Sequence, residues 1–327
     1  MQSKVNKIVL IGGCGFLGIE TANLLKLNKF DVLIIDLPTN KFKCPEGIKF
    51  QGLNLLDNNF KDNINLEKND IVVNLASRQY LNNIPYMNRQ KWFDEINLEV
   101  ANILLDLSIK KKAFGYIFFS TDMVYGKINT IQVKENYKLN PIAEYGLSKA
   151  KSENLLINNA KNKIPLTIFR PRLISGPGRL GVFKNLFNLI KKSLPVPIIG
   201  KGNNCYQMVS VFDCANAILK AIDKNIPSEI FNLASNDSIA VHKLMENLID
   251  HAHSKSKILK INSKIIKPIL FIFDLLGKTI LYKEQYSIAD KNITLDISKA
   301  KKLLDWEPEF NDQQMINEAY DFWLKND

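Results

Sequence analysis

The sequence predicts an α/β fold in which a doubly wound parallel sheet is followed by a smaller C-terminal α/β domain. Apolar runs of strand length alternate with helical segments up to about residue 172, which is typical of a parallel sheet with right-handed crossovers. The 327 residues, 46% of them hydrophobic, suffice for two domains of ~150 residues each. Because the alternation weakens afterwards, we expect domains at residues 1–172 and 173–327, with residues 229–233 and some later segments returning to the large sheet.

A glycine-rich turn joins the first predicted strand, residues 7–11, to a helix at residues 19–27. Gly12 permits a tight turn, Gly15 lets a pyrophosphate approach the backbone, and Gly18 lets the helix pack closely on the strand. Glycines in this spacing between a strand and a helix indicate a Rossmann dinucleotide-binding domain.

The predicted dinucleotide is NAD. A second apolar strand, residues 32–35, ends at Asp36, about 20 residues beyond the glycine turn, where a carboxylate accepts hydrogen bonds from the adenosine ribose. The same carboxylate repels a 2′-phosphate, so we expect NAD rather than NADP. Phe16 and Leu17 lie in the turn, just before the helix whose N–H groups face the phosphates, and are further candidate cofactor contacts.

Tyr145 and Lys149 form a second motif, four residues apart in a predicted helix. Residues at this spacing share one helix face, so the phenol and the ammonium group point into the same cleft. A free tyrosine titrates near ~10, and a lysine charge ~4 Å away at an effective dielectric of ~20 supplies the ~4 kcal/mol that lowers this pKa to ~7. We therefore expect Tyr145 to act as a base near neutral pH.

The two motifs in this order resemble the extended short-chain dehydrogenase/reductase superfamily, specifically its branch of NAD-dependent nucleotide-sugar epimerases and dehydratases. The resemblance covers almost the whole chain and includes segments at residues 71–77, 116–126, 170–178 and 296–308. It implies that Leu75 and Ala76 lie beside the cofactor, that Asn97 is structural, and that Thr121 hydrogen-bonds the reacting oxygen together with Tyr145. It also implies a role in nucleotide-sugar metabolism and polysaccharide biosynthesis.

The chain has only five arginines, and three of them fall within ten residues on the segment that the family uses to enter its substrate pocket. Arginine suits bidentate phosphate binding, so Arg78, Arg172 and Arg179 are candidate substrate contacts. We expect Arg179 to contact a diphosphate, although a structural salt bridge remains the alternative for each of them.

Departures from the family pattern narrow the reaction. Asp122 is followed by Met123 where sugar 4,6-dehydratases have two acids, and a thioether cannot transfer a proton, so elimination of water is disfavoured. Tyr206 stands where many members have an arginine for the nucleotide phosphates. Asp122, Met123 and Tyr206 are nevertheless expected to contact the substrate.

The predicted function is an NAD-dependent epimerase of a nucleoside diphosphate sugar, similar to UDP-glucose 4-epimerase and acting through a keto intermediate. One alternative is an NAD(P)-dependent dehydrogenase or reductase of a keto-sugar or of an apolar, steroid-like alcohol. An alternative of another class is a non-catalytic, dinucleotide-sensing regulator. A complete set of Thr121, Tyr145 and Lys149 favours the enzymes.

Composition excludes several other classes. The net charge of +11 comes almost wholly from lysine, 39 of the 44 basic residues, scattered along the chain, so nucleic-acid binding is disfavoured. Four cysteines without a CxxC pair and three histidines in the C-terminal third predict no metal site and no disulfide framework. No secretory leader precedes the first strand, so we expect a cytoplasmic protein.

The resemblance implies a homodimer formed by helices near residues 94–110 and 145–159.

The most apolar segment spans residues 265–277. It is too short to cross a bilayer and is interrupted by Lys267, Pro268 and Asp274. We expect it to pack inside the small domain. The alternatives are an apolar surface at a partner protein, at a membrane or at a lipid-like substrate.

Overall fold

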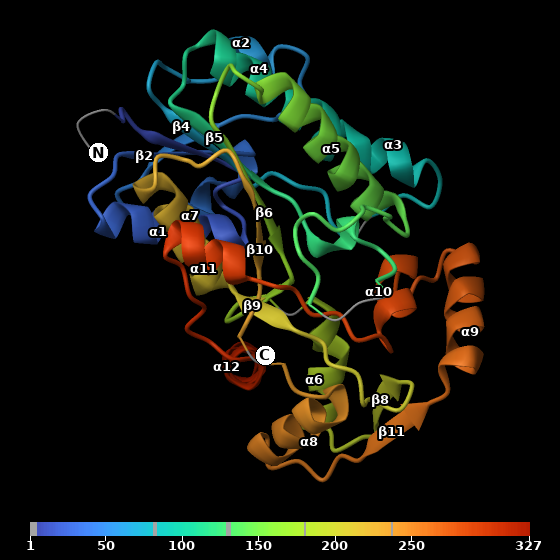
Figure 1. The fold of residues 1–327 in the computed structure, drawn as a ribbon. Helices are drawn as coiled ribbons and strands as arrows, with labels where there is room; N and C mark the ends of the chain where they lie inside the picture. Colours follow the sequence, from blue (N-terminus) through green and yellow to red (C-terminus); the bar gives the residue numbers. More distant parts are fainter. Residues whose placement is uncertain (1–4, 81–83, 129–131, 180, 237) are drawn as a thin grey trace.

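The computed structural model describes residues 5–80, 84–128, 132–179, 181–236 and 238–327. Its centre is a seven-stranded parallel sheet with strand order β10-β6-β5-β4-β1-β2-β3 (Figure 1). The strands are β1 (Ile8–Ile11), β2 (Val32–Asp36), β3 (Lys49–Gly52), β4 (Ile71–Asn74), β5 (Gly115–Phe119), β6 (Leu166–Pro171) and β10 (Ile230–Leu233). The predicted doubly wound parallel sheet is confirmed, and the late strand β10 pairs with β6 at its edge.

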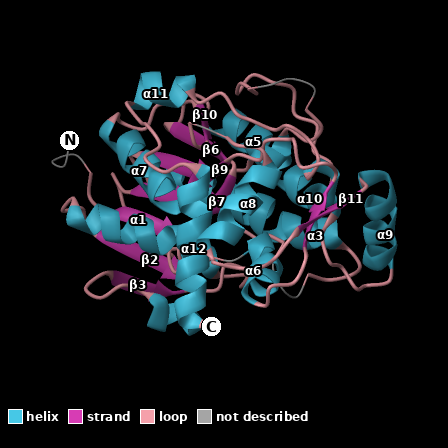
Figure 2. Ribbon diagram, turned by 90° about the horizontal axis from the view of Figure 1, so that it is seen from below, coloured by secondary structure: helices cyan, strands magenta, loops and turns pink. Residues whose placement is uncertain are grey.

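Helices cover both faces of this sheet (Figure 2). One face carries α1 (Phe16–Leu27), α7 (Val211–Asp223) and α11 (Ser298–Leu304); the other carries α2 (Phe60–Asn63), α4 (Ala101–Lys110) and α5 (Glu144–Ala160). Alternate strand residues supply the two cores: Ile8 and Leu10 of β1 pack toward α1 and α7, whereas Val9 and Ile11 pack toward α4 and α5. The strands are apolar along their length because both of their faces are buried.

The remaining segments form a smaller unit beside the sheet. Two short parallel pairs join β7 (Leu173–Ser175) to β9 (Met208–Ser210), and β8 (Val196–Ile199) to β11 (Ile258–Ile261). Its helices are α6 (Lys184–Lys191), α8 (Val241–His251), α9 (Ser263–Leu275), α10 (Lys283–Ile288) and α12 (Asp312–Asn326). Phe187, Tyr320 and Trp323 pack together in its core. The proposed domain boundary after residue 172 lies between β6 and β7.

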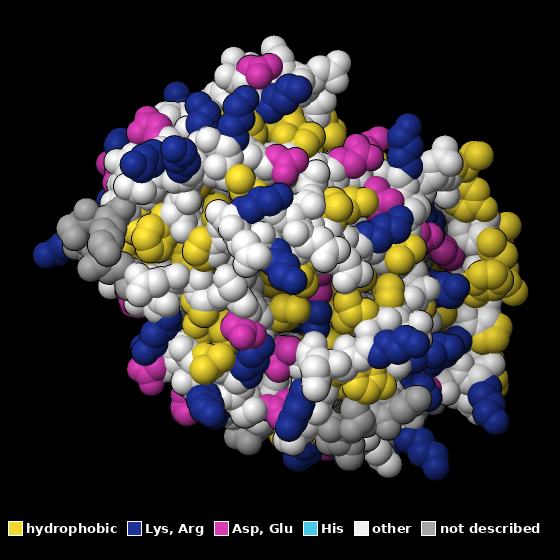
Figure 3. Space-filling view, turned by 45° about the horizontal axis from the view of Figure 1, so that its top comes forward, with side chains coloured by type: hydrophobic (Ala, Val, Ile, Leu, Met, Phe, Trp, Pro, Cys, Tyr) yellow, Lys and Arg dark blue, Asp and Glu magenta, His cyan; other side chains and the backbone are white. Residues whose placement is uncertain are grey.

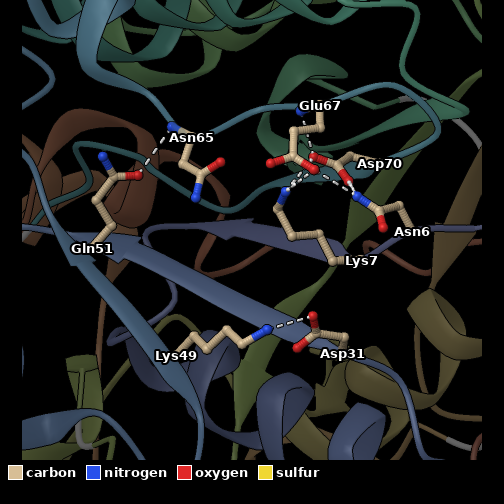
Figure 4. Close-up of polar contacts among 8 residues, drawn as sticks. All are labelled: Asn6, Lys7, Asp31, Lys49, Gln51, Asn65, Glu67 and Asp70. Carbon is tan, nitrogen blue, oxygen red and sulfur yellow. Dashed lines mark hydrogen bonds and ion pairs between the residues drawn. The ribbon is translucent and has the colours of Figure 1, made fainter.

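Polar contacts tie the amino ends of the strands together (Figure 4). Lys7, just before β1, pairs with the buried Asp70, just before β4, at 3.1 Å. Lys49 of β3 pairs with Asp31, just before β2, at 2.7 Å. The opposite edge, formed by the carboxyl ends of the strands, is the one at which parallel sheets of this type bind ligands.

Helix α9 contains most of the apolar segment, and the expectation that this segment packs inside the small domain is wrong. Leu270 is the one buried residue of this fully described helix, whereas Ile265 and Ile272 are 60% and 54% exposed. The helix lies at the right-hand edge of the molecule in Figure 1 and contacts α10. Among the described residues, no helix is both long enough and apolar enough to cross a membrane.

Candidate active site

A cleft of about 1620 Å³ opens at the carboxyl ends of β1, β2, β4 and β5 and extends to the smaller unit. It exceeds the ~300–1,000 Å³ of cavities that hold one drug-sized ligand, so it has room for a dinucleotide and a second molecule. Nearly all of the predicted site residues line it, namely Gly12, Gly15, Phe16, Leu17, Gly18, Asp36, Leu75, Ala76, Arg78, Thr121, Asp122, Met123, Tyr145, Lys149, Arg172 and Arg179. Tyr206 is not among the lining residues.

The glycine turn has the geometry that a dinucleotide requires. Gly12 has a φ of 76°, and a Cβ on it would lie 2.8 Å from the backbone nitrogen of Ala76. A Cβ on Gly18 would lie 2.6 Å from the backbone of Gly13, because helix and turn touch there. A Cβ on Gly15 would meet only the Gly12 carbonyl, so the space that a pyrophosphate needs is open on this side. No side chain caps the N-terminus of α1.

Asp36 is held at the edge of the same turn. Its Oδ1 accepts hydrogen bonds from the Leu37 amide at 2.7 Å and from Asn40 Nδ2 at 2.8 Å, and its Oδ2 accepts one from the Cys14 amide at 2.9 Å. These bonds fix the carboxylate beside the glycine turn. Since a carboxylate oxygen can accept more than one bond, Asp36 retains capacity for ribose hydroxyl groups.

Tyr145, Thr121 and Lys149 come together from two elements. Tyr145 lies in the first turn of α5, and its side chain is buried near Thr121 and Ser77, whose hydroxyl groups act to lower the pKa of the phenol. Thr121 follows β5 and caps the short 3-10 helix Asp122–Val124 by accepting from the Met123 amide at 3.2 Å. Lys149, one turn further along α5, donates from Nζ to the Phe119 carbonyl at 2.8 Å.

The electrostatics of this group differ from the prediction. Burial raises the pKa of Tyr145 to about 12, although the charge of Arg179 and the hydrogen bonds from Ser77 and Thr121 act in the opposite direction. Burial also lowers the pKa of Lys149 to about 7, with the charge of Glu153 opposing this change. The expectation that Lys149 brings the Tyr145 pKa to ~7 is therefore wrong in this structure. The cation with the largest effect on the pKa of the Tyr145 phenol is Arg179, and the opposite effect of desolvation is larger.

Asn97 connects segments that border the cleft. It lies in a π-helical turn, Glu95–Val100, which interrupts the helix between α3 (Arg89–Asp94) and α4. Its Oδ1 accepts from the Ser77 hydroxyl at 3.1 Å and from the Arg78 amide at 2.9 Å. Its Nδ2 donates to Ser148 Oγ at 3.0 Å. The π-helical turn thus joins the segment after β4 to α5, and π-helical turns are frequent at functional sites.

The predicted substrate arginines have different environments. Arg172 is buried, bonds Asp122 through Nη1 and lies over the Tyr206 ring at 4.4 Å, so these three residues form one cluster. Arg78 is bound to Glu95 at 2.6 Å and lies over the Trp92 ring at 4.6 Å.

Arg179 is the remaining predicted arginine of the cleft. It bonds the side chain of Gln79 and lies 5.8 Å from the ring centroid of Phe16 in the glycine turn. Arg179 is therefore near the start of α1, and its charge acts on Tyr145.

Comparison with known proteins agrees with this geometry. The model of the family described as "NAD dependent epimerase/dehydratase family" matches residues 8–234. The chain belongs to this family.

Relatives in several branches of the epimerase/dehydratase family resemble the whole chain. A putative UDP-glucose 4-epimerase of Methanocaldococcus jannaschii is 27% identical over 98% of both chains. A decarboxylating sterol-4-alpha-carboxylate 3-dehydrogenase of Candida albicans is 23% identical over 100% of both. The crystal structure of UDP-glucuronic acid 4-epimerase from Bacillus cereus with UDP-glucuronic acid and NAD has a TM-score of 0.78 and 22% identity, covering 98% of this chain and 100% of that one.

Membership of the family confirms two predictions: the resemblance to extended short-chain dehydrogenases and the assignment as an NAD-dependent enzyme. The glycine turn and Asp36 fit this cofactor, because the turn leaves open space and the carboxylate retains acceptor capacity. A non-catalytic regulator is correspondingly disfavoured.

Three residues of this epimerase/dehydratase site were not predicted. Ser77 acts on the pKa of Tyr145 and could have been suspected because it follows the end of a predicted strand. Glu284 is fully buried, and its Oε1 accepts from the Ala143 and Gly146 amides at 3.1 and 2.9 Å, so it caps the N-terminus of the catalytic helix. Tyr80 packs edge-on against Tyr145. No local sequence signal marks Glu284 or Tyr80.

Proposed function

We propose that the protein is an NAD-dependent epimerase of a nucleoside diphosphate sugar that acts by reversible hydride transfer through a keto intermediate. The observation that carries this proposal is that Tyr145, Thr121 and Ser77 meet at the cleft, where both hydroxyl groups act to lower the pKa of the Tyr145 phenol. A sugar hydroxyl that meets Tyr145 there has a proton acceptor and an orienting hydroxyl in reach.

One group of residues binds the cofactor, and another group transfers the proton. The turn at Gly12, Gly15 and Gly18 and the carboxylate of Asp36 hold the dinucleotide. NAD, when bound, accepts the hydride from the sugar carbon and returns it to the opposite face of the resulting ketone.

Proton transfer is assigned to the other side of the cleft. Tyr145 takes the hydroxyl proton of the sugar and later gives it back, while Thr121 orients the reacting oxygen. Lys149, held one helical turn from Tyr145 by its bond to the Phe119 carbonyl, binds the nicotinamide ribose.

Arg179 is proposed to contact the diphosphate of the substrate. Its guanidinium lies within the cleft, and arginine binds phosphate oxygens bidentately. Its positive charge also favours the phenolate form of Tyr145, which burial disfavours. Arg179 thereby links substrate binding to activation of the base.

Elimination of water is disfavoured by the neighbours of Tyr145. A dehydratase needs a second acid and base beside the tyrosine, yet Asp122 is bonded to the buried Arg172 and Met123 has no titratable group. The site therefore supports removal of one proton from a hydroxyl oxygen and of one hydride from the carbon that carries this hydroxyl group.

Isotope labelling tests this function. A panel of UDP-, GDP- and dTDP-sugars deuterated at the reacting carbon is incubated with purified protein. An epimerase returns the hydride that it removed, so the epimeric product should keep its label and no stoichiometric NADH should be released. Label in free NADH, with one ketone formed for each NAD consumed, would replace the epimerase by a dehydrogenase and leave the roles of Thr121, Tyr145 and Lys149 unchanged.

A dehydrogenase of a keto-sugar or of an apolar, steroid-like alcohol is the second candidate. It is favoured by Tyr206, which occupies the position of the phosphate-binding arginine and stacks on Arg172 instead. It is also favoured by the exposed apolar side chains of Tyr86 and Ile280 at the cleft. Ketone and alcohol substrates with added NAD or NADH test it directly.

We also propose a homodimer and a cytoplasmic location. Leu147 and Ile157 on the outer side of α5 are 38% and 39% exposed, and a second copy would cover them. Light scattering after gel filtration should show a dimer that Leu147→Asp weakens.

A further inference from the structure

The exposed side of helix α9 carries a row of aliphatic residues. Ile265, Ile269, Ile272 and Leu276 recur at the spacing of one helix face, and their exposed fractions are 60%, 40%, 54% and 68%. Leu275 extends this row at 54% exposure. We refer to these five residues as the apolar face of α9. Amphipathic helices of globular proteins turn such a face inward, whereas α9 turns it outward.

The opposite side of α9 is charged and fixes the helix in this orientation. Asp274 accepts two hydrogen bonds from the guanidinium of Arg89, at 2.8 and 2.9 Å. Lys267 Nζ pairs with Asp290 at 2.6 Å and donates to the Ser287 carbonyl at 3.0 Å. Because its polar side chains are bound to the protein, α9 cannot bury its apolar face by rotating about its axis without breaking these pairs.

The apolar face continues to the mouth of the catalytic cleft. The Tyr86 hydroxyl donates to the Leu275 carbonyl, and Tyr86, Met87 and Ile280 are 55%, 73% and 56% exposed. Tyr86 and Ile280 also line the cleft. In Figure 3 hydrophobic side chains follow one another along the right-hand edge over α9, and basic side chains outnumber acidic ones beside them.

The charge around this surface is positive. Residues 255–291 contain eight lysines and three acids. Two of the acids, Asp274 and Asp290, are ion-paired, and the third, Glu284, is buried. Seven of the lysines are exposed, namely Lys255, Lys257, Lys260, Lys264, Lys278, Lys283 and Lys291.

This charge discriminates between possible occupants of the apolar face. A second copy of the chain would bring the same lysines together, and no acid within residues 255–291 is exposed to offset them. An anionic bilayer attracts each lysine near its surface by ~1 kcal/mol and accepts aliphatic side chains at the boundary between headgroups and acyl chains.

We propose that the apolar face of α9 and the exposed lysines around it dock the protein on the surface of an anionic lipid bilayer, with the mouth of the catalytic cleft beside the membrane. The helix lies on the bilayer rather than across it, as its 13 residues require. This proposal does not depend on whether the enzyme is an epimerase or a dehydrogenase.

Vesicle flotation with the full-length protein tests the proposal. Vesicles of phosphatidylcholine alone are compared with an equimolar mixture of phosphatidylcholine and phosphatidylglycerol. We expect at least ~10-fold tighter binding to the anionic vesicles, since several lysines contribute ~1 kcal/mol each and 1.4 kcal/mol is tenfold. The double variant Ile269→Asp/Ile272→Asp should bind them at least ~10-fold more weakly, because two buried aliphatic side chains are replaced by anions.

Two further variants control for folding and for specificity. Leu27→Asp, at a leucine that is 80% exposed on α1, should leave vesicle binding unchanged. Lys264→Glu/Lys278→Glu keeps the apolar face and should weaken binding to anionic vesicles without changing binding to neutral ones.

The proposal is overturned if the unaltered protein does not float with anionic vesicles, or if the double aspartate variant floats equally well. Concentration-dependent self-association that Ile269→Asp/Ile272→Asp abolishes, without vesicle binding, would identify the face as a contact between copies instead. Loss of binding in Leu27→Asp to the same extent would show that the membrane recognises exposed leucines in general.

Discussion

Glu284 connects the smaller unit to the catalytic helix, and its replacement by glutamine should make the stability of the protein less dependent on pH. The carboxyl group is fully buried, and its Oε1 accepts bonds from Ala143 and Gly146 at the start of α5. Burial raises its pKa from 4.5 to about 7, because the hydrogen bonds from the Gly146 and Ala143 amides and the nearby Tyr80 hydroxyl compensate only in part. Glutamine keeps the shape and an acceptor oxygen but cannot titrate.

The direction in which stability changes with pH follows from the raised pKa of Glu284. Between pH 4.5 and about 7 the folded protein holds a proton that the unfolded chain has released, so the stabilisation by Glu284 is fully present below 4.5 and is lost as the pH rises through about 7. At ~1.4 kcal/mol per unit, the effect amounts to ~3 kcal/mol. The free energy of unfolding of the unaltered protein, relative to Glu284→Gln, should therefore fall by ~2–3 kcal/mol between about pH 5 and about pH 8.

Urea unfolding at several pH values measures this difference. Glu284→Ala is the matched control, because it removes the titrating group and also the acceptor for Ala143 and Gly146. Relative to Glu284→Ala, the free energy of unfolding of the unaltered protein should depend on pH in the same way as it does relative to Glu284→Gln. It should also be higher by a constant ~1–3 kcal/mol, because the alanine variant lacks the hydrogen bonds to Ala143 and Gly146. A difference between the unaltered protein and Glu284→Gln that stays constant from about pH 5 to about pH 8 would refute the raised pKa.

Three further predictions concern the cleft. Tyr145→Phe should lower turnover at least ~100-fold with NAD affinity nearly unchanged in a fluorescence titration, since the lost group transfers a proton; near-normal turnover would exclude Tyr145 as the base. Asp36→Ala should narrow the preference for NAD over NADP in parallel titrations; tighter NADP binding by the unaltered protein would contradict the assigned role. Gly18→Ala should lower the melting temperature by several degrees, because its Cβ would lie 2.6 Å from the backbone of Gly13; an unchanged melting temperature would mean that α1 shifts freely.

The sequence predicted the parts of the site that depend on local pattern. The glycine turn, Asp36 and the pair Tyr145 and Lys149 each stand in one short segment, and the parallel sheet brings the ends of such segments to one edge. The pairing of Glu284 with the start of α5 joins residues 138 positions apart, and nothing in either segment indicates it.

Burial and exposure were harder to predict. A lysine beside a tyrosine suggests a low phenol pKa, but the balance depends on how much water the fold removes from Tyr145, and that amount is set by packing across the whole cleft. The apolar segment in α9 has the composition of a core helix. Its orientation is fixed by Arg89, 185 positions from the Asp274 that it binds, and by Asp290 of the following segment, which binds Lys267.

The late return of the chain to the large sheet has a consequence for synthesis on the ribosome. Helix α7, strand β10 and helix α11 complete one face of a sheet whose first strand, β1, ends at residue 11, whereas α7 begins only at residue 211. Until these segments leave the exit tunnel, α1 alone covers the apolar side of β1 and its neighbours, and the rest of that side stays open to solvent. Truncation at residue 172 should therefore yield an aggregating fragment rather than a soluble NAD-binding domain, and chaperones that hold nascent chains should associate with this protein until residue 304 has emerged.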